Sequence, residues 1–300
     1  MLMFSIILTI WMINILVTGS NGQLGSSIVS LENNFSDYNI LFTDIYDLDL
    51  LNFSAVENYV VKNKIEVIIN CAAYTNVDKA EDEPGIANEI NNSAVENLAR
   101  LAKKFQMKLI HISTDYVFDG NAEKPYNETD KPNPQSIYGL TKIKGEKAMK
   151  TINPDNSLIL RTSWLYSEYG HNFVKTILKL AEEKEKISVV SNQIGSPTYA
   201  YDLAKAILQL IPSLKNKGVQ IYHYANKGKC SWFEFAEEIV HLSNNICSVE
   251  AIPSERFETK ANRPKFSLLN TDKIEREFQI EIPYWKDSLK NCLLKGIKHN

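Results

Sequence analysis

Apolar runs alternate with longer stretches of helical periodicity through the first half of the chain. The runs are continuously apolar, as expected of strands in a parallel sheet that helices cover on both faces. They predict five strands, at residues 13–18, 39–43, 67–71, 109–113 and 158–162. The stretch 91–105 carries apolar residues at helical spacing and predicts a crossover helix. Together these elements indicate an α/β fold with a doubly wound parallel sheet.

The pattern loosens after about residue 162, where helices predicted at 172–184, 201–211 and 232–243 are separated by turn-rich segments. We therefore expect a first domain at residues 12–162 and a smaller lobe, mainly at residues 163–300, with some segments returning to the first domain. The sequence contains no internal repeat or low-complexity stretch, which excludes solenoids and disordered tails.

Residues 1–11 are apolar and uncharged, and a second methionine, Met12, stands directly before the first predicted strand. The stretch is too short to span a bilayer, and it lacks the basic region and the cleavage site of a secretory signal. We expect translation to begin naturally at Met12, with residues 1–11 a non-native or flexible extension. Mass spectrometry of the native N-terminus tests this expectation.

Charge and cysteine content narrow the class of protein. The formal net charge of −3 and the pI near 6.0 disfavour nucleic acid or an anionic membrane as a partner, because both attract basic surfaces. The four cysteines show no C-x-x-C spacing, which fits a reducing cytoplasm. With 300 residues and 44% hydrophobic content, the chain can bury a large core without disulfides.

A glycine-rich segment directly follows the first predicted strand. It has the spacing G-x-x-G-x-x-G and leads into a helical pattern. Glycines there allow a tight turn and a close approach of backbone to a diphosphate, and the helix N-terminus offers free N–H groups to the anion. The motif predicts a Rossmann-type site for NADPH or NADH, although a plain strand-to-helix turn would show similar spacing. The expected cofactor contacts are Gly19, Asn21, Gly22, Gln23, Leu24 and Gly25.

Further cofactor contacts are expected at the ends of the next two strands. Asp44 stands just after the second strand, where an acidic side chain commonly accepts hydrogen bonds from the adenosine ribose. This slightly favours NADH over NADPH, although a solvated loop aspartate is an equal alternative. Small residues at the end of the third strand suit a backbone close to a cofactor, or plain packing. The expected contacts are Asp44, Asp49, Leu50, Ala72, Ala73 and Thr75.

Tyr138 and Lys142 stand four residues apart and therefore on one face of a helix. Reduction of a carbonyl by hydride leaves an alkoxide that must be protonated, and a phenol with a pKa of about 10 is a poor donor until a nearby cation shifts that pKa. We expect Lys142 to supply this cation and to hold the nicotinamide ribose. Thr114 ends the preceding strand, where it can donate to the carbonyl oxygen, and Asp115 can accept from a substrate hydroxyl. A strand-end turn with an N-cap is the alternative for both residues.

These motifs resemble those of the dTDP-4-dehydrorhamnose reductase family of extended short-chain dehydrogenases, from Met12 to about Leu289. The shared segments are residues 19–25, 70–81, 113–120, 138–146, 161–166, 172–176, 193–198 and 263–269. The resemblance implies NAD(P)H-dependent reduction of a 4-keto group, with Tyr138 as proton donor, Lys142 as its partner and Thr114 tuning the site. It also implies that the second lobe binds a nucleotide sugar. The implied substrate contacts are Thr114, Asp115, Tyr116, Trp164, Asn172 and Arg263.

Several of these inferences have alternatives. Trp164 can pack flat against a sugar or base, or belong to the core. Arg263 can grip a diphosphate through its bidentate fork, or form a structural ion pair. Tyr74 stands where many family members have histidine. The resemblance allows Mg²⁺, which glutamates bridge in dimers of some members, but residues 285–300 contain no glutamate, so the metal and the choice between monomer and homodimer stay open.

Other functions have to be separated from that of a reductase. Dehydratases of this fold carry an Asp-Glu pair after the strand-end threonine, whereas this chain has Asp115-Tyr116 and lacks that base. An epimerase regenerates its cofactor, while a reductase consumes it. A regulatory subunit keeps the dinucleotide fold without turnover, and a reductase of another nucleotide-4-ketosugar would share these motifs. We expect a cytoplasmic enzyme that acts on a small nucleotide sugar, without nucleic-acid or membrane partners.

Overall fold

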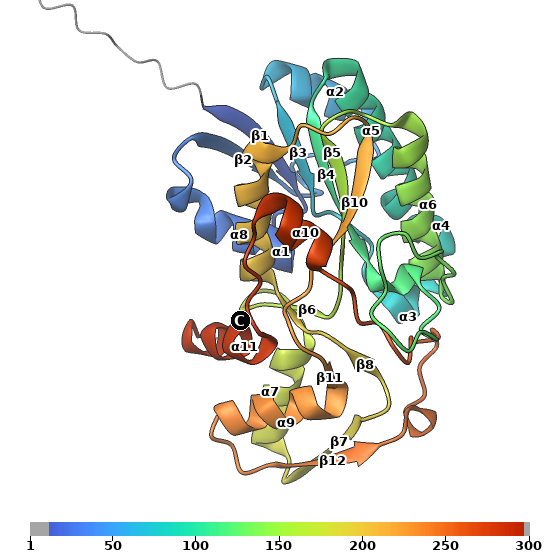
Figure 1. The fold of residues 1–300 in the computed structure, drawn as a ribbon, viewed down its shortest axis with the longest axis vertical. Helices are drawn as coiled ribbons and strands as arrows, with labels where there is room; N and C mark the ends of the chain where they lie inside the picture. Colours follow the sequence, from blue (N-terminus) through green and yellow to red (C-terminus); the bar gives the residue numbers. More distant parts are fainter. Residues whose placement is uncertain (1–11, 297–300) are drawn as a thin grey trace, which may run out of the picture.

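A computed structural model describes residues 12–296, and the expected extension at residues 1–11 lies outside this range. Its centre is a parallel sheet of six strands in the order β10-β5-β4-β3-β1-β2 (Figure 1). The predicted α/β class is confirmed, and the five strands predicted from apolar runs are present with ends that differ by at most one residue. The strands are β1 (Ile13–Thr18), β2 (Tyr38–Thr43), β3 (Val67–Asn70), β4 (Lys108–Thr114), β5 (Ser157–Thr162) and β10 (Val219–His223).

The sixth strand, β10, is not among the predicted strands and comes from the second half of the chain. It lies at the edge of the sheet beside β5, with Val219 opposite Ser157 and His223 opposite Arg161. Its first three residues are only partly buried, and Gln220 interrupts the apolar run. The continuous apolar pattern that identifies a central strand is therefore absent.

Helices cover both faces of the sheet, because alternate residues of each strand point to opposite sides. Ile15 and Val17 of β1 pack on one side and Leu16 on the other, in two separate hydrophobic cores. The helices on the first side are α1 (Gln23–Leu31) and α8 (Ala200–Leu210). Those on the second side are α2 (Phe53–Lys62), α5 (Ala94–Phe105) and α6 (Ile137–Ile152).

The helix expected at 91–105 begins later than predicted, because α4 (Pro84–Asn88) and a π-helical turn (Glu89–Ser93) precede α5. The turn carries Asn91, whose side chain is fully buried. Its Nδ2 donates to the carbonyl oxygen of Tyr74 and to the hydroxyl of Thr141, each at 3.1 Å. Asn91 therefore ties the segment after β3 to helix α6.

The second lobe lies beyond the carboxyl ends of the central strands (Figure 1). The helices predicted at 172–184, 201–211 and 232–243 are present within one residue at each end. The lobe contains α7 (Phe173–Glu183), α9 (Trp232–Leu242) and α11 (Trp285–Leu294), packed with the parallel strands β7 (Lys186–Val190) and β12 (Ser248–Ile252). Two shorter pairs are β6 (Leu165–Tyr166) with β9 (Thr198–Tyr199) and β8 (Ile194–Gly195) with β11 (Cys230–Ser231).

The remaining helices are α3 (Val77–Ala80) and α10 (Asp272–Phe278), and the 3₁₀ turn η3 (Asp115–Val117) follows β4. No helix within residues 12–296 combines the length and the apolar character needed to cross a membrane.

Candidate active site

A cleft of about 1090 Å³ lies at the carboxyl ends of the central strands, where open α/β sheets bind their ligands. The second lobe forms its other wall. All residues that the sequence analysis assigned to cofactor, proton transfer or substrate line this one cleft. They are Gly19, Asn21, Gly22, Gln23, Leu24, Gly25, Asp44, Asp49, Leu50, Ala72, Ala73, Thr75, Thr114, Asp115, Tyr116, Tyr138, Lys142, Trp164, Asn172 and Arg263.

The glycine-rich loop owes its shape to two positions where a side chain has no room. Gly19 has a φ of +65°, and a Cβ built on it would lie 2.8 Å from the Cα of Ala72. A Cβ on Gly25 would lie 2.4 Å from the carbonyl oxygen of Gly19. Both contacts involve backbone atoms that cannot move aside cheaply. The loop after β1 therefore lies directly against Ala72 at the end of β3, a contact of the kind that the packing alternative for this small residue describes.

Helix α1 begins inside the cleft with its N–H groups unused by any cap. The N-cap residue is Gly22, which has no side chain that could accept a hydrogen bond from the first turn of the helix. Free N–H groups and the helix dipole make such an end attractive to a phosphate. Gln23 joins this end to the second lobe, because its Nε2 donates to the carbonyl oxygen of Leu165 at 3.4 Å and its Oε1 accepts from Ser167 at 3.2 Å.

Two aspartates mark the end of the cleft beside β2. Asp44 accepts from the backbone N–H of Asn21 at 2.9 Å and from that of Ile45 at 2.8 Å. Asp49 accepts from the N–H of Leu51 at 2.9 Å. The only lysine and arginine among the cleft-lining residues are Lys142 and Arg263, which come from α6 and from the second lobe. The β2 end of the cleft is therefore lined by carboxylates without a cation.

Tyr138 lies in the first turn of α6, and three contacts hold this turn in place. Ser136 caps the helix by accepting from the N–H of Gly139 at 3.2 Å, and Glu81 accepts from the N–H of Ile137 at 2.8 Å. A Cβ on Gly139 would lie 2.1 Å from the carbonyl oxygen of Tyr116, so the missing side chain lets η3 approach α6. The rings of Tyr116 and Tyr138 meet edge to face, 5.5 Å apart.

Lys142 follows one turn later and is fully buried, at 1% exposure. Its Nζ donates to the carbonyl oxygen of Ile112 on β4 at 2.6 Å. Burial lowers the pKa of Lys142 to about 8, and the neighbouring carboxylate of Glu146 opposes this shift. The ammonium therefore loses its proton much more readily than an exposed lysine does.

The phenol of Tyr138 differs from the sequence-based expectation. Its pKa is raised to about 12, chiefly by burial, while a hydrogen bond with Thr114 lowers it and the charge of Asp115 raises it. The expected lowering of this pKa by Lys142 is not found, because the cost of burying a phenolate outweighs it and the ammonium is directed at Ile112. Tyr138 is thus firmly protonated at neutral pH.

Thr114 and Asp115 lie beside Tyr138 at the end of β4. The hydroxyl of Thr114 donates to Asp115 at 3.0 Å and also accepts from the N–H of Tyr116 at 3.2 Å, so Thr114 caps η3 as the alternative reading anticipated. Burial raises the pKa of Asp115 to about 6, against the lowering effect of the neighbouring hydroxyls of Ser267 and Thr114, and its Oδ2 is buried without a partner in good hydrogen-bond geometry. A buried acceptor without a partner suits a ligand hydroxyl.

Trp164 is held in an unusual backbone conformation, with a φ of +47°. For a bulky residue this costs about 1–2 kcal/mol. Its ring stacks on that of Trp232 at 3.6 Å and 10°, and a Cβ on Gly195 would lie 2.6 Å from the Trp164 ring. Trp164 therefore packs against Trp232 and also lines the cleft. Core packing and contact with a sugar or base are thus compatible roles for this residue.

Comparisons with known proteins identify the family of the chain. Residues 13–297 match the family described as the RmlD substrate binding domain. The dTDP-4-dehydrorhamnose reductase of Aggregatibacter actinomycetemcomitans is 39% identical over 289 residues, which are 93% of this chain and 98% of that protein. The chain belongs to the dTDP-4-dehydrorhamnose reductase family. The resemblance inferred from the motifs is thus confirmed.

The names of two further relatives mention a cofactor or a sugar. The structure of a dTDP-4-dehydrorhamnose reductase from Bacillus anthracis, in complex with NADP, has a TM-score of 0.90 and 40% identity, covering 95% of this chain and 99% of that one. A dTDP-4-keto-6-deoxy-D-glucose reductase from Streptomyces niveus is 32% identical over 275 residues, with 91% and 94% coverage. The family therefore includes proteins named for different 4-keto sugars.

The remaining two substrate candidates of this dTDP-4-dehydrorhamnose reductase family member are engaged in the fold. Asn172 caps α7 and donates to the carbonyl oxygen of Ser167 at 2.8 Å, so its amide is largely used. Arg263 pairs with Asp78 of α3 at 2.9 Å, and its Nε is buried without a partner. The structural ion pair considered for Arg263 is present, and one N–H remains for a ligand.

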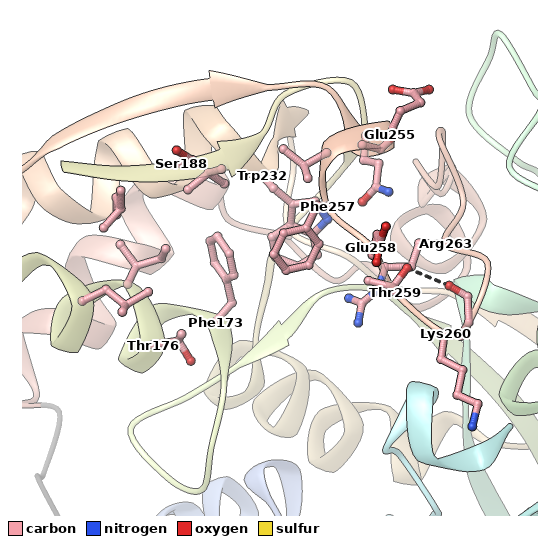
Figure 2. A pocket seen from close by; sticks show the side chains of 18 of the residues that line it. Phe173, Thr176, Ser188, Trp232, Glu255, Phe257, Glu258, Thr259, Lys260 and Arg263 are labelled. Atoms are coloured by element: carbon pink, nitrogen blue, oxygen red, sulfur yellow. Dashed lines mark hydrogen bonds between the residues drawn. The ribbon is translucent and has the colours of Figure 1, made fainter. Parts of the chain in front are cut away.

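A second cavity, of about 870 Å³, adjoins the cleft and shares Asn172, Phe173, Trp232 and Arg263 with it. Figure 2 shows aromatic side chains on one side of this cavity and the charged side chains Glu258, Lys260 and Arg263 on the other. The ring of Phe257 is 54% exposed although it faces the cavity. The sequence analysis did not identify Phe173, Trp232 or Phe257; their only signal was an aromatic residue at each helix start or beside a turn.

No cluster of three or more histidine, cysteine, aspartate or glutamate side chains within residues 12–296 could hold a metal ion. The four cysteines are all free.

Proposed function

We propose that this chain reduces the 4-keto group of dTDP-4-dehydro-L-rhamnose to give dTDP-L-rhamnose, with NADPH or NADH as reductant. The observation that carries the proposal is the convergence of Thr114, Tyr138 and Lys142 in one cleft with an open, glycine-rich helix N-terminus. Relatives named for this activity match nearly the whole chain.

The residues present fit a dinucleotide. Gly19 and Gly25 allow the tight backbone of the loop, and the uncapped start of α1 offers N–H groups to a diphosphate. Lys142 is placed to hold the nicotinamide ribose and Asp44 the adenosine ribose. When bound, NAD(P)H supplies the hydride.

The chain's own groups then manage the oxygen of the substrate carbonyl. The hydroxyl of Thr114, which donates to Asp115 in this structure, turns its single proton to the carbonyl oxygen when substrate is bound, and Tyr138 gives its phenolic proton to the alkoxide that reduction leaves. An alkoxide is a far stronger base than a phenolate, so the transfer is downhill even though the pKa of Tyr138 is about 12. Lys142, one helical turn further along α6, is proposed to hold the nicotinamide ribose beside the phenol. The second lobe supplies the other wall of the cleft.

The second cavity is proposed to take the nucleoside of the substrate, because its aromatic wall adjoins Arg263, which is proposed to hold the diphosphate. Phe257→Ala is expected to raise KM for the nucleotide sugar about tenfold with kcat unchanged, since a lost stacking contact removes binding in ground and transition states alike. Steady-state kinetics measure this split. Phe105→Ala, which removes another exposed ring outside both cavities, should leave KM unchanged; a fall in kcat alone at position 257 would contradict the assignment.

The carboxylates at the β2 end are proposed to select between cofactors. Asp44→Ser is expected to raise the ratio of kcat/KM for NADPH to that for NADH about tenfold or more, because a 2′-phosphate would otherwise approach a carboxylate with no cation nearby. Loss of the hydrogen bond between Asp44 and Asn21 would affect both cofactors alike, so it would not change the ratio of the two kcat/KM values. Asp37→Ser, at the opposite end of β2, is the matched control. An unchanged ratio would remove Asp44 from cofactor selection.

The direct test is oxidation of NADH or NADPH, followed by absorbance, with dTDP-4-dehydro-L-rhamnose as substrate. Stoichiometric loss of the reduced cofactor supports a reductase and argues against an epimerase, which regenerates its cofactor. Turnover only with dTDP-4-keto-6-deoxy-D-glucose would favour the second candidate, which the Streptomyces niveus relative suggests. Cofactor binding without turnover of either sugar would favour a regulatory subunit.

We further propose a cytoplasmic enzyme, since the four free cysteines suit a reducing compartment. The proposed division assigns residues 12–162 to cofactor binding and most of residues 163–300 to substrate binding, with β10 returning to the central sheet. The proposed partner is the small nucleotide sugar, and the chain would act as a monomer or homodimer. Size-exclusion chromatography with light scattering distinguishes these two states.

A further inference from the structure

Three charges lie in a row beneath the active site. Lys142 and Glu146 stand one turn apart on α6, and Arg161 on β5 follows Glu146. All three side chains are buried, each at 1% exposure. The row therefore begins at a proposed catalytic residue and continues into the interior of the protein.

Glu146 is fixed by three donors. Arg161 donates from Nε to Oε1 at 2.9 Å and from Nη2 to Oε2 at 2.6 Å, and Ser113 donates to Oε1 at 2.6 Å. Arg161 is held in turn, because its guanidinium lies 5.1 Å from the ring of Phe118 and its Nη1 is 3.5 Å from Nε2 of His223. A bidentate guanidinium holds a carboxylate in its ionised form and in one orientation.

Stability alone does not account for this arrangement. A buried ion pair costs desolvation that its attraction only partly repays, and apolar side chains of the same size often stabilise a fold equally well. Here the desolvation involves a third charge, that of Lys142. Glu146 stands four residues after Lys142 on the same face of α6 and acts electrostatically on the ammonium, which offers a functional reason for burying it.

Apart from Glu146 and Asp115, the titratable groups described around Lys142 carry no negative charge at neutral pH. Burial raises the pKa of the Cys71 thiol to about 12, and burial together with Lys142 holds the pKa of His111 well below its usual range. Tyr138 is protonated, and Asp115 acts on Tyr138 rather than on the ammonium. Of the described groups that act on Lys142, Glu146 is thus the anion that opposes the loss of its proton.

We propose that Glu146 is a positioning residue of the reduction: its carboxylate, fixed by Arg161, keeps the ammonium of Lys142 protonated and seated on the carbonyl of Ile112 below Tyr138. The inference rests on the proposed function for its meaning. The test of the inference is independent of the proposed function, because the affinity for NADH also reports the charge of Lys142. Glu146 touches neither ligand and acts through the lysine.

The test is the pH dependence of Glu146→Gln. Lys142 is charged below its pKa of about 8 and loses its charge as pH rises, so removing the opposing carboxylate moves this loss to lower pH. We expect the alkaline limb of kcat/KM, and of NADH affinity measured by fluorescence, to move down by about one pH unit. At pH values above the alkaline limbs of both proteins, the variant is then about tenfold less active than wild type. At pH 6 the two activities differ far less.

The matched control is Glu96→Gln, which breaks an exposed Glu–Arg pair on α5 and should leave the pH profile unchanged. Glu146→Asp, which keeps the charge, should restore the wild-type limb. A uniform loss of activity at every pH in Glu146→Gln, with the limb unmoved, would overturn the proposal and leave Glu146 a structural residue.

Glu146→Gln leaves Arg161 buried without its partner, so this variant is checked by thermal unfolding. If it fails to fold, the double variant Glu146→Gln/Arg161→Met replaces it, because the unpaired cation is then removed as well. The downward shift of the limb in NADH affinity is expected there too, and its absence would overturn the proposal. Wild-type protein that binds NADH with this pH dependence but turns over no sugar would refute the proposed function alone.

Discussion

Tyr138→Phe is expected to lower kcat about a thousandfold while leaving the affinity for NADH nearly unchanged. The change removes one oxygen, so the alkoxide left by reduction has no positioned acid, and such acids contribute roughly 10²–10⁴ in rate. The ring stays in place because the helix start is held by Ser136 and Glu81 rather than by the phenol. Stopped-flow measurement of cofactor oxidation gives the rate, and fluorescence titration gives the affinity.

Tyr116→Phe is the matched comparison, because the rings of Tyr116 and Tyr138 are 5.5 Å apart and line the same cleft. If Tyr138 is the acid, Tyr116→Phe loses less than about tenfold. Near-normal turnover in Tyr138→Phe, or a greater loss in Tyr116→Phe, would assign the proton transfer to another group. Both variants keep the aromatic packing, so unfolding does not confuse the comparison.

Gly25→Ala is expected to weaken dinucleotide binding by about tenfold to a hundredfold. The new methyl group would lie 2.4 Å from the carbonyl oxygen of Gly19 and 2.5 Å from the Cα of Ser20, so the loop must move. Overpacking of this kind costs about 1–3 kcal/mol, and each 1.4 kcal/mol lost from binding is a factor of ten. Fluorescence titration with NADH measures the affinity.

Gly85→Ala on α4 is the control, because a Cβ there meets no atom within 4 Å. It should leave NADH affinity unchanged and raise the free energy of unfolding by about 0.5–1 kcal/mol, as alanine is the better helix former. Equal effects of the two substitutions on affinity would show that the glycine loop is not specifically shaped for the dinucleotide.

The sequence could predict most of the central sheet because burial on both faces leaves a direct trace in the chain. Strands β1 to β5 are predominantly apolar, and each was identified within one residue at either end. The edge strand β10 was missed because half-burial lets polar residues enter it. Local pattern reports how deeply a segment is buried, and it cannot report which distant strand a half-buried segment joins.

The candidate site was predictable where chemistry depends on close sequence spacing. Tyr138 and Lys142 share a helix face, and the glycine loop follows β1 directly. The partners of Trp164 and Arg263 were not predictable, since Trp232 and Asp78 are far from them in the chain. The pKa of Tyr138 was misjudged for the same reason: burial by segments remote in sequence dominates it.

With Arg263 in its proposed role of holding the diphosphate, the ion pair between Arg263 and Asp78 would make the enzyme selective for charge before any sugar ring is recognised. The pair joins the second lobe to α3, and the N–H of Ala261 adds a hydrogen bond to the same aspartate at 3.0 Å. A ligand that recruits this guanidinium has to outcompete a carboxylate that is already in place. A doubly charged pyrophosphate linkage can do so, whereas an uncharged free hexose cannot.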